Sequence, residues 1–208
     1  MKAYVTYTLT DDNKIDIAYE ATTTAPTVIN MTNHSYFNLS GDPANNSVLK
    51  HLLCINSTSF TPVDDTYMTT GEIVPIEGTP FDFQQFKPVG LDINADDEQI
   101  RNGNGYDHNW VLKTGGDISK MAAVLSSPES GITLFVYTDE PGIQVYSGNF
   151  LDGTNTGKKG VVYQQRHGIC LETQHYPDTP NKPDWPSAVL RPGETYHSHT
   201  IFAFSVKE

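Results

Sequence analysis

The sequence predicts an all-β fold, and three observations support this prediction. Short runs of alternating apolar and polar residues recur along the chain, which is the pattern of half-buried strands. No segment longer than a turn or two shows the helical spacing of apolar residues. The composition, with 16 Gly, 13 Pro and 11 Tyr among 208 residues, is typical of a loop-rich β protein rather than of a disordered chain.

The strands are expected in the following order. Two alternating runs, residues 4–9 and 15–20, flank the turn residues Asp11, Asp12 and Asn13, so they predict a hairpin with one buried face. A third run covers residues 27–32. A second hairpin is expected around the loop 127–131. The remaining expected strands are 121–126, 132–138, 142–147, 168–173 and 200–206.

The segments between these strands are long and polar. They cover residues 41–48, 62–83, 91–106, 151–160 and 176–192. Long connections in a compact domain are commonly functional. The sequence shows no repeat, charge block or linker, so residues 1–208 are expected to form a single domain.

The charge balance excludes some partners. With 13 basic and 25 acidic side chains, the formal net charge is −12, so we expect no binding to nucleic acid and none to anionic membranes. No apolar run reaches the length of a membrane span. The two cysteines, Cys54 and Cys170, lack metal or redox spacing; they are expected to be buried small residues, with a disulfide left open.

Two segments place catalytic residue types among amides, glycines and aromatic residues. In the first, His34 lies between Asn33 and Tyr36, a setting that can hold an imidazole in one orientation, although an isolated histidine is more often structural. In the second, a glycine-rich turn is expected to deliver Asp107 and Trp110 to the mouth of a strand. Taken alone, that segment is equally a turn that ends in a buried tryptophan.

Two later segments complete the candidate site. Gln144 and Tyr146 share one face of a predicted strand, and an amide beside an aromatic ring suits the hydroxyls and the flat apolar face of a sugar. Glu172 follows an apolar run, so burial should raise the pKa of its carboxyl toward the range of a general base. Without partners, such a glutamate would form only an ion pair on the sheet surface.

A metal site is not expected. His197 and His199 alternate at the start of the C-terminal strand region, just before residues 200–206, and would share a face. No third ligand lies at a suitable spacing, so packing is the preferred interpretation.

Several motifs, in this order, resemble the aldose 1-epimerase (galactose mutarotase) family. They are NHSYFNL at 33–39, GYDHN at 105–109, GIQVYSGNFLDG at 142–153, LETQ at 171–174 and LRPGETY at 190–196. The resemblance implies a large curved antiparallel β-sandwich, the galactose mutarotase-like supersandwich, that interconverts the α and β anomers of free aldohexoses such as glucose and galactose. No cofactor is implied.

The resemblance also implies roles for particular residues. Glu172 matches the glutamate that removes the proton from the C1 hydroxyl, and His34 matches the histidine that protonates the ring oxygen. Asp107 and Gln144 match residues that hold sugar hydroxyls, and we expect Trp110 and Tyr146 to contribute to the sugar platform. Such chemistry feeds intracellular kinases, so the expected location is the cytoplasm.

The sequence departs from the family at its start, because the family's first third has no counterpart here. That segment carries an arginine and a second histidine of the family site. We therefore expect much weaker activity than in a full-length relative, or none, and self-association through exposed sheet edges.

Two other functions compete with this one. A non-catalytic carbohydrate-binding β domain would use the same platform without turnover. A glycosidase would use Asp107 and Glu172 as its carboxylate pair, which would leave His34 without a role.

Overall fold

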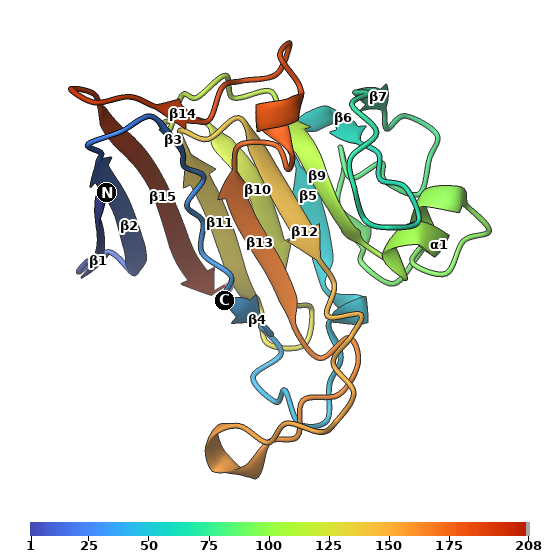
Figure 1. Ribbon diagram of the computed structural model, residues 1–208. Helices are drawn as coiled ribbons and strands as arrows, with labels where there is room; N and C mark the ends of the chain where they lie inside the picture. Colours follow the sequence, from blue (N-terminus) through green and yellow to red (C-terminus); the bar gives the residue numbers. More distant parts are fainter. Residues whose placement is uncertain (207–208) are drawn as a thin grey trace.

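The structure, a computed structural model, describes residues 1–206 and consists of two antiparallel sheets that face each other (Figure 1). The prediction of an all-β sandwich is confirmed. The first sheet has seven strands in the order β1-β2-β15-β11-β10-β5-β8. These strands are β1 (Lys2–Leu9), β2 (Lys14–Thr22), β15 (Thr195–Val206), β11 (Ile132–Thr138), β10 (Met121–Ser126), β5 (Leu52–Ile55) and β8 (Lys87–Pro88).

The second sheet has six strands in the order β4-β13-β12-β9-β6-β7. They are β4 (Tyr36–Phe37), β13 (Ile169–Gln174), β12 (Gly142–Tyr146), β9 (Asp107–Leu112), β6 (Ser57–Thr61) and β7 (Val74–Pro75). A small third sheet pairs β14 (Val189–Leu190) with β3 (Thr27–Val28). The helical elements are the α-helix α1 (Glu98–Gly103) and three 3₁₀ turns, η1 (Val48–Lys50), η2 (Lys158–Gly160) and η3 (Thr179–Asn181).

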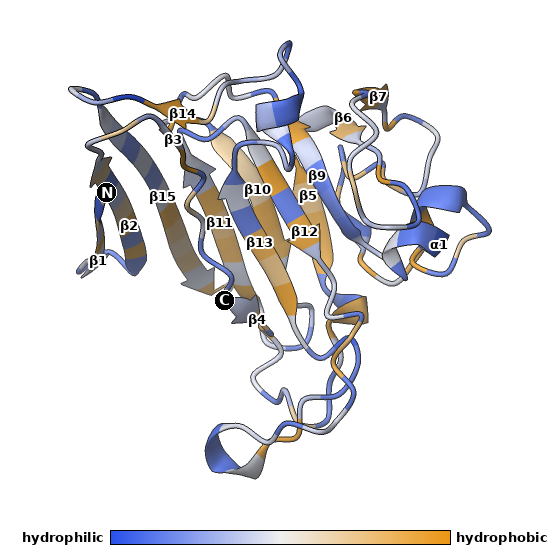
Figure 2. Cartoon of the chain, in the orientation of Figure 1, coloured by the Kyte–Doolittle hydropathy of each residue, from blue (hydrophilic) through white to orange (hydrophobic). Residues whose placement is uncertain are grey.

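The main hydrophobic core lies between the two large sheets. It draws side chains from both, for example Leu53 and Leu134 from the first sheet and Trp110 and Val145 from the second, all of them inaccessible to solvent. Hydrophobic residues are concentrated along the central strands, whereas much of the connecting chain is hydrophilic (Figure 2). Alternation therefore gives the six-stranded sheet one face toward the core and a second face that is free to carry a site.

The two expected hairpins form, but the first is less buried than its alternation predicts. In β2, Ile17, Tyr19 and Ala21 are buried, and each alternates with an exposed residue. Every residue of β1 is exposed. The expectation of one buried face is wrong for β1, because it is an edge strand on which no described element packs.

The third expected strand is also much shorter than predicted. Of residues 27–32, only Thr27–Val28 pair, and they pair with β14. The chain from residue 29 to 35 runs without strand pairing. In addition, the sequence interpretation did not assign strands to residues 52–55 and 57–61, which form β5 and β6.

Candidate active site

The strand register of the second sheet brings most of the predicted site residues together. Asp107 on β9 pairs with Tyr146 on β12, and Tyr146 pairs with Cys170 on β13. In the next row of the same face, Gln144 on β12 pairs with Glu172 on β13. Residues paired directly across neighbouring strands have their side chains in contact range, so alternation and register together build one polar and aromatic surface.

The turn before β9 fixes the position of Asp107. It contains Gly105, whose φ of +123° lies in the region that favours glycine. A Cβ atom at this position would lie 2.8 Å from Asn149 Oδ1. Asn149 in turn donates from Nδ2 to the carbonyls of Gly103 and Tyr106 at 2.8 and 3.0 Å. The close approach between these two loops therefore requires a glycine here.

His34 reaches the same surface from the unpaired segment before β4. Its Nε2 lies 3.3 Å from Glu172 Oε1, with the histidine side chain 50% and the glutamate side chain 9% exposed. The segment is tied to the end of β13 by Asn30, which donates from Nδ2 to the carbonyl of His175 (2.9 Å) and accepts at Oδ1 from the His175 amide (3.0 Å). The pair of imidazole and carboxylate is thus formed by a loop residue and a strand residue.

Together these side chains form a cleft of about 410 Å³, which is within the size range of small-molecule sites. Seven of its nine lining residues are tyrosines or have polar or titratable side chains. The lining residues are His34, Tyr36, Asp107, Gln144, Tyr146, Phe150, Glu172, Gln174 and Pro177.

Aromatic rings surround the histidine. The His34 ring centroid lies 5.1 Å from that of Tyr36 and 6.0 Å from that of Tyr146. Tyr146 also stacks on Phe150, with ring centroids 6.2 Å apart and an interplanar angle of 21°. These rings provide flat apolar faces beside the acid–base pair.

Burial raises the pKa values of the two carboxyl groups in the cleft, Glu172 and Asp107. Desolvation, followed by the nearby charge of Asp107, raises the pKa of Glu172 to about 7. Burial also raises the pKa of Asp107, while a hydrogen bond from Gln144 Nε2 to Asp107 Oδ1 (2.9 Å) works in the opposite direction. A carboxyl group with a pKa near neutrality is well suited to accept and return a proton.

A chain of amides orients the polar floor of the cleft. Gln174 donates from Nε2 to Gln144 Oε1 at 3.3 Å, and Gln144 donates to Asp107 as described. Each amide therefore has a fixed orientation, which leaves the second carboxylate oxygen of Asp107 to accept from a ligand hydroxyl.

Trp110 is not part of this surface, and its expected role as a substrate-binding residue is wrong. It alternates with Asp107 along β9, so its side chain points into the core, where it is 0% exposed. Its Nε1–H donates to the carbonyl of Phe81 at 3.0 Å. Phe81 and Phe83 pack against the indole with centroids 5.7 and 6.0 Å away.

The structure adds residues that the sequence interpretation did not select. Tyr36, Phe150, Gln174 and Pro177 all line the cleft. A signal was present for Gln174, because it lies two residues after Glu172 and so shares its face of the strand. Phe150 and Pro177 lie in loops, where no periodicity indicates which side chains turn inward.

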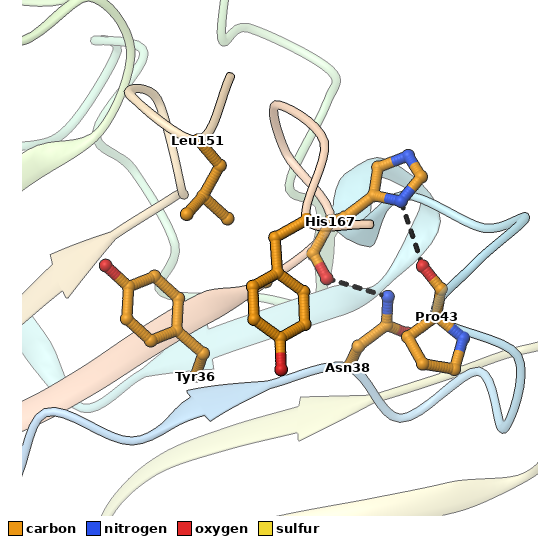
Figure 3. A pocket seen from close by; sticks show the side chains of 7 residues that line it. Tyr36, Asn38, Pro43, Leu151 and His167 are labelled. Atoms are coloured by element: carbon orange, nitrogen blue, oxygen red, sulfur yellow. Dashed lines mark hydrogen bonds between the residues drawn. The ribbon is translucent and has the colours of Figure 1, made fainter. Parts of the chain in front are cut away.

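A second hollow shares one lining residue, Tyr36, with the cleft (Figure 3). It has a volume of about 400 Å³ and a largely apolar lining. Its polar contacts hold loops together: Asn38 Nδ2 donates to the carbonyl of His167 (3.0 Å), and His167 Nδ1 lies 2.9 Å from the carbonyl oxygen of Pro43. It contains no pairing of an acid with a base, so the chemistry is assigned to the cleft.

The remaining sequence candidates do not line the cleft. His199 Nε2 lies 2.6 Å from Asp16 Oδ1, whereas His197 belongs to no metal-type cluster among the described residues. Cys54 and Cys170 are free thiols, the first half-buried and the second buried. Within residues 1–206, no helix is long and apolar enough to cross a membrane.

Comparisons with known proteins identify the family of this chain. The family model described as Aldose 1-epimerase matches residues 1–203. Galactose mutarotase from Mus musculus is 47% identical over 206 residues, which cover 99% of this chain and 58% of that protein. Aldose 1-epimerase from Escherichia coli (strain K12) is 43% identical over 204 residues, covering 97% of this chain and 58% of that protein. The chain therefore spans 58% of the length of these curated relatives.

Solved structures give the same result. An aldose epimerase homologue from C. elegans superimposes with a TM-score of 0.85 at 32% identity, covering 98% of this chain and 59% of that one. Galactose 1-epimerase from Lactobacillus acidophilus NCFM gives a TM-score of 0.84 at 29% identity, covering 99% of this chain and 57% of that one.

Proposed function

This chain belongs to the aldose 1-epimerase family, and from that premise we propose that it interconverts the α and β anomers of free aldohexoses, with glucose and galactose as the expected substrates. The observation that carries the proposal is the pairing of His34 Nε2 with Glu172 Oε1 at 3.3 Å in a cleft of about 410 Å³. The names of the relatives indicate the substrate class.

The two side chains suit an acid–base ring opening. Glu172 takes the proton of the C1 hydroxyl while His34 gives a proton to the ring oxygen, and the bond between C1 and the ring oxygen breaks to leave the open-chain aldehyde. Rotation about C1–C2 and reversal of both transfers close the ring as the other anomer. The two oxygens are attached to the same carbon, so groups as close together as His34 and Glu172 can each reach one of them.

Protonation states support this division of roles. Since the pKa of Glu172 is raised to about 7, the carboxyl is neither too weak a base to accept the proton nor too strong a base to return it at neutral pH. A positioned acid or base typically contributes about 10²- to 10⁴-fold in rate, so the pair together provides much of the acceleration that mutarotation needs.

The other cleft residues hold the sugar. We assign Asp107 and Gln144, joined by their 2.9 Å hydrogen bond, to the ring hydroxyls, and Tyr146 to the apolar face of the ring. Tyr146 Oη accepts from the Phe150 amide at 2.9 Å, which fixes the orientation of the tyrosine ring.

Polarimetry on freshly dissolved α-D-glucose and α-D-galactose tests the proposal. Residues 1–208 should accelerate the approach to anomeric equilibrium, and Glu172→Gln and His34→Asn should remove the acceleration. The matched control, Glu77→Gln, changes an exposed carboxylate outside the cleft and should have no effect. A longer relative measured in parallel shows how the rate of this chain compares.

The same measurements test the alternative function, sugar binding without catalysis. If calorimetry shows saturable sugar binding by the folded chain but polarimetry shows no acceleration, residues 1–208 act as a carbohydrate-binding domain. If Glu172→Gln keeps the full rate, then the assignment of the base is wrong.

We further propose that the chain self-associates through β1. This edge strand exposes the side chains of Tyr4, Val5, Tyr7 and Leu9, and an uncovered edge with apolar side chains readily pairs with a second copy. Light scattering should show a concentration-dependent oligomer that Val5→Lys reduces, and a monomer at all concentrations would contradict this proposal.

The location of the protein follows from its proposed chemistry. An enzyme that supplies the anomer used by intracellular sugar kinases would act in the cytoplasm, and we propose that location. Cell fractionation followed by immunoblotting would test it.

A further inference from the structure

A third side chain, which the proposed reaction does not use, is buried beside His34 and Glu172. Cys170 lies two residues before Glu172 on β13, so both side chains are on the cleft side of the strand. The thiol is 0% exposed, and within residues 1–206 it takes part in no hydrogen bond. No polar partner therefore explains the position of the Cys170 thiol, and the proposed proton transfer does not need it.

Cys170 forms a compact group with the acid–base pair. One ligand-type atom from each of His34, Cys170 and Glu172 lies within 4.8 Å of the other two, and the His34 Nε2 to Glu172 Oε1 distance is 3.3 Å. Zinc is bound at about 2.3 Å by thiolate sulfur and at about 2.0–2.2 Å by imidazole nitrogen and carboxylate oxygen, usually in tetrahedral geometry. Tetrahedral ligands at such lengths lie about 3.3–3.8 Å apart, so small side-chain adjustments would bring the three atoms to ligand spacing.

The Glu172 carboxylate also points to a ligand. It is 7% exposed, it lines the cleft, and His34 is its one polar side-chain partner among the described residues. A buried carboxylate normally has several hydrogen-bond donors or a cation. The negative charge of Asp107 nearby adds to the attraction for a positive ion.

We propose that His34, Cys170 and Glu172 form a binding site for a thiophilic divalent cation, with Zn²⁺ as the representative ion, and that the bound ion blocks the cleft to sugar. Three protein ligands leave a fourth position for water, as in open zinc sites. The ion would occupy both the proton donor and the proton acceptor, so metal and sugar compete for the same groups. The metal site stands on geometry alone, whereas the blocking of catalysis rests on the proposed function.

Formation of the site requires one proton to be released. Burial raises the pKa of the Cys170 thiol, so the free chain holds a neutral thiol at neutral pH. A metal ion deprotonates a coordinating thiol outright, and the proton goes to solvent as the metal–sulfur bond forms. No oxidant or reductant takes part.

Cobalt is the direct probe of this site, because a thiolate bound to Co²⁺ gives a charge-transfer absorption that nitrogen and oxygen ligands do not give. The reduced, tag-free chain is titrated with Co²⁺, and Zn²⁺ is then added to displace it. We expect one equivalent of Co²⁺ to produce the sulfur band and Zn²⁺ to abolish it. Absence of the band would overturn the proposal.

Substitutions of the two cysteines test whether the sulfur of Cys170 binds the metal. Cys170→Ser should abolish the band, and Cys54→Ser is the matched control, because it removes the other free thiol, which belongs to no group of possible metal ligands among the described residues. Removing an outer-shell partner already costs about 10- to 100-fold in metal affinity, so loss of the Cys170 sulfur should weaken Zn²⁺ binding by at least about 100-fold. If Cys170→Ser fails to fold by circular dichroism, His34→Asn provides the second test, and it should weaken Zn²⁺ binding similarly. A band that survives Cys170→Ser or disappears with Cys54→Ser refutes the assignment.

Competition tests the second half of the proposal. Saturating galactose should weaken Zn²⁺ binding, and Zn²⁺ should slow mutarotation in the parent chain and in Cys54→Ser but not in Cys170→Ser. If the band forms through Cys170 yet galactose does not compete, the blocking role is wrong while the metal site stands. Polarimetry in metal-free buffer decides the proposed function separately.

Discussion

Replacing Glu172 by Gln should stabilise the protein at neutral and alkaline pH while it removes the base. The pKa of this carboxyl is raised from 4.5 to about 7 by burial and by Asp107. The folded state therefore binds a proton more tightly than the unfolded state does. As the pH rises from about 4.5 to about 7, the wild-type chain loses stability, because the folded state must ionise a buried carboxyl.

The size of the effect follows from the two pKa values. Their difference is about 2.5, and each pKa unit corresponds to about 1.36 kcal/mol, so the free energy of unfolding of Glu172→Gln relative to wild type should rise by about 3 kcal/mol between pH 4.5 and pH 8. For a chain of this length, that is about 6–12 °C in Tm. Other titrating groups, including the buried His108, are present in both proteins and cancel in the comparison.

Urea denaturation at several pH values between 4.5 and 8.5 measures this difference directly. The control, Glu77→Gln, removes an exposed carboxylate and should give a difference that hardly changes with pH. If the Glu172→Gln difference were also independent of pH, then Glu172 would not be held in a desolvated site. The explanation that burial raises the pKa of Glu172 would then also be wrong.

Three further predictions concern the acid, the core and the domain. His34→Asn should lower the mutarotation rate by about 10²- to 10⁴-fold while sugar affinity by calorimetry changes little; a comparable loss of affinity would make His34 a binding residue. Trp110→Phe removes the buried hydrogen bond to the Phe81 carbonyl and should cost about 1–3 kcal/mol in urea denaturation with unchanged KM, whereas a raised KM would return Trp110 to the site. Residues 1–208, expected to be a single β-sandwich domain, should unfold in one transition that is coincident by fluorescence and circular dichroism, and two separated transitions would divide the chain into smaller units.

Alternation predicted correctly which residues of one strand share a face. Gln144 and Tyr146 do share the cleft face of β12, and Glu172 does lie on the neighbouring strand. The same rule also separates Asp107 from Trp110, since residues three apart on a strand point to opposite faces. The error at Trp110 therefore arose because the segment 107–112 was interpreted as a turn leading to a strand and not as the strand β9 itself.

Other features could not be derived from periodicity. The position of His34 depends on a loop whose course is set by Asn30 and the backbone of His175, a contact 145 residues apart in the sequence. The exposure of β1 depends on what packs above it, whereas its alternating sequence is the same as that of a half-buried strand. Local patterns thus indicated most of the longer strands but not β5 and β6, while long-range contacts decided which side chains meet.

The hydrogen bonds of Asn30 link the positions of His34 and Glu172 to the same strand. Glu172 belongs to β13, and the loop carrying His34 is anchored at Asn30 to the residue that directly follows that strand. A small displacement of β13 within the sheet would therefore move His34 and Glu172 in the same direction. The distance between these two side chains therefore depends on the position of a single strand, although His34 belongs to a loop.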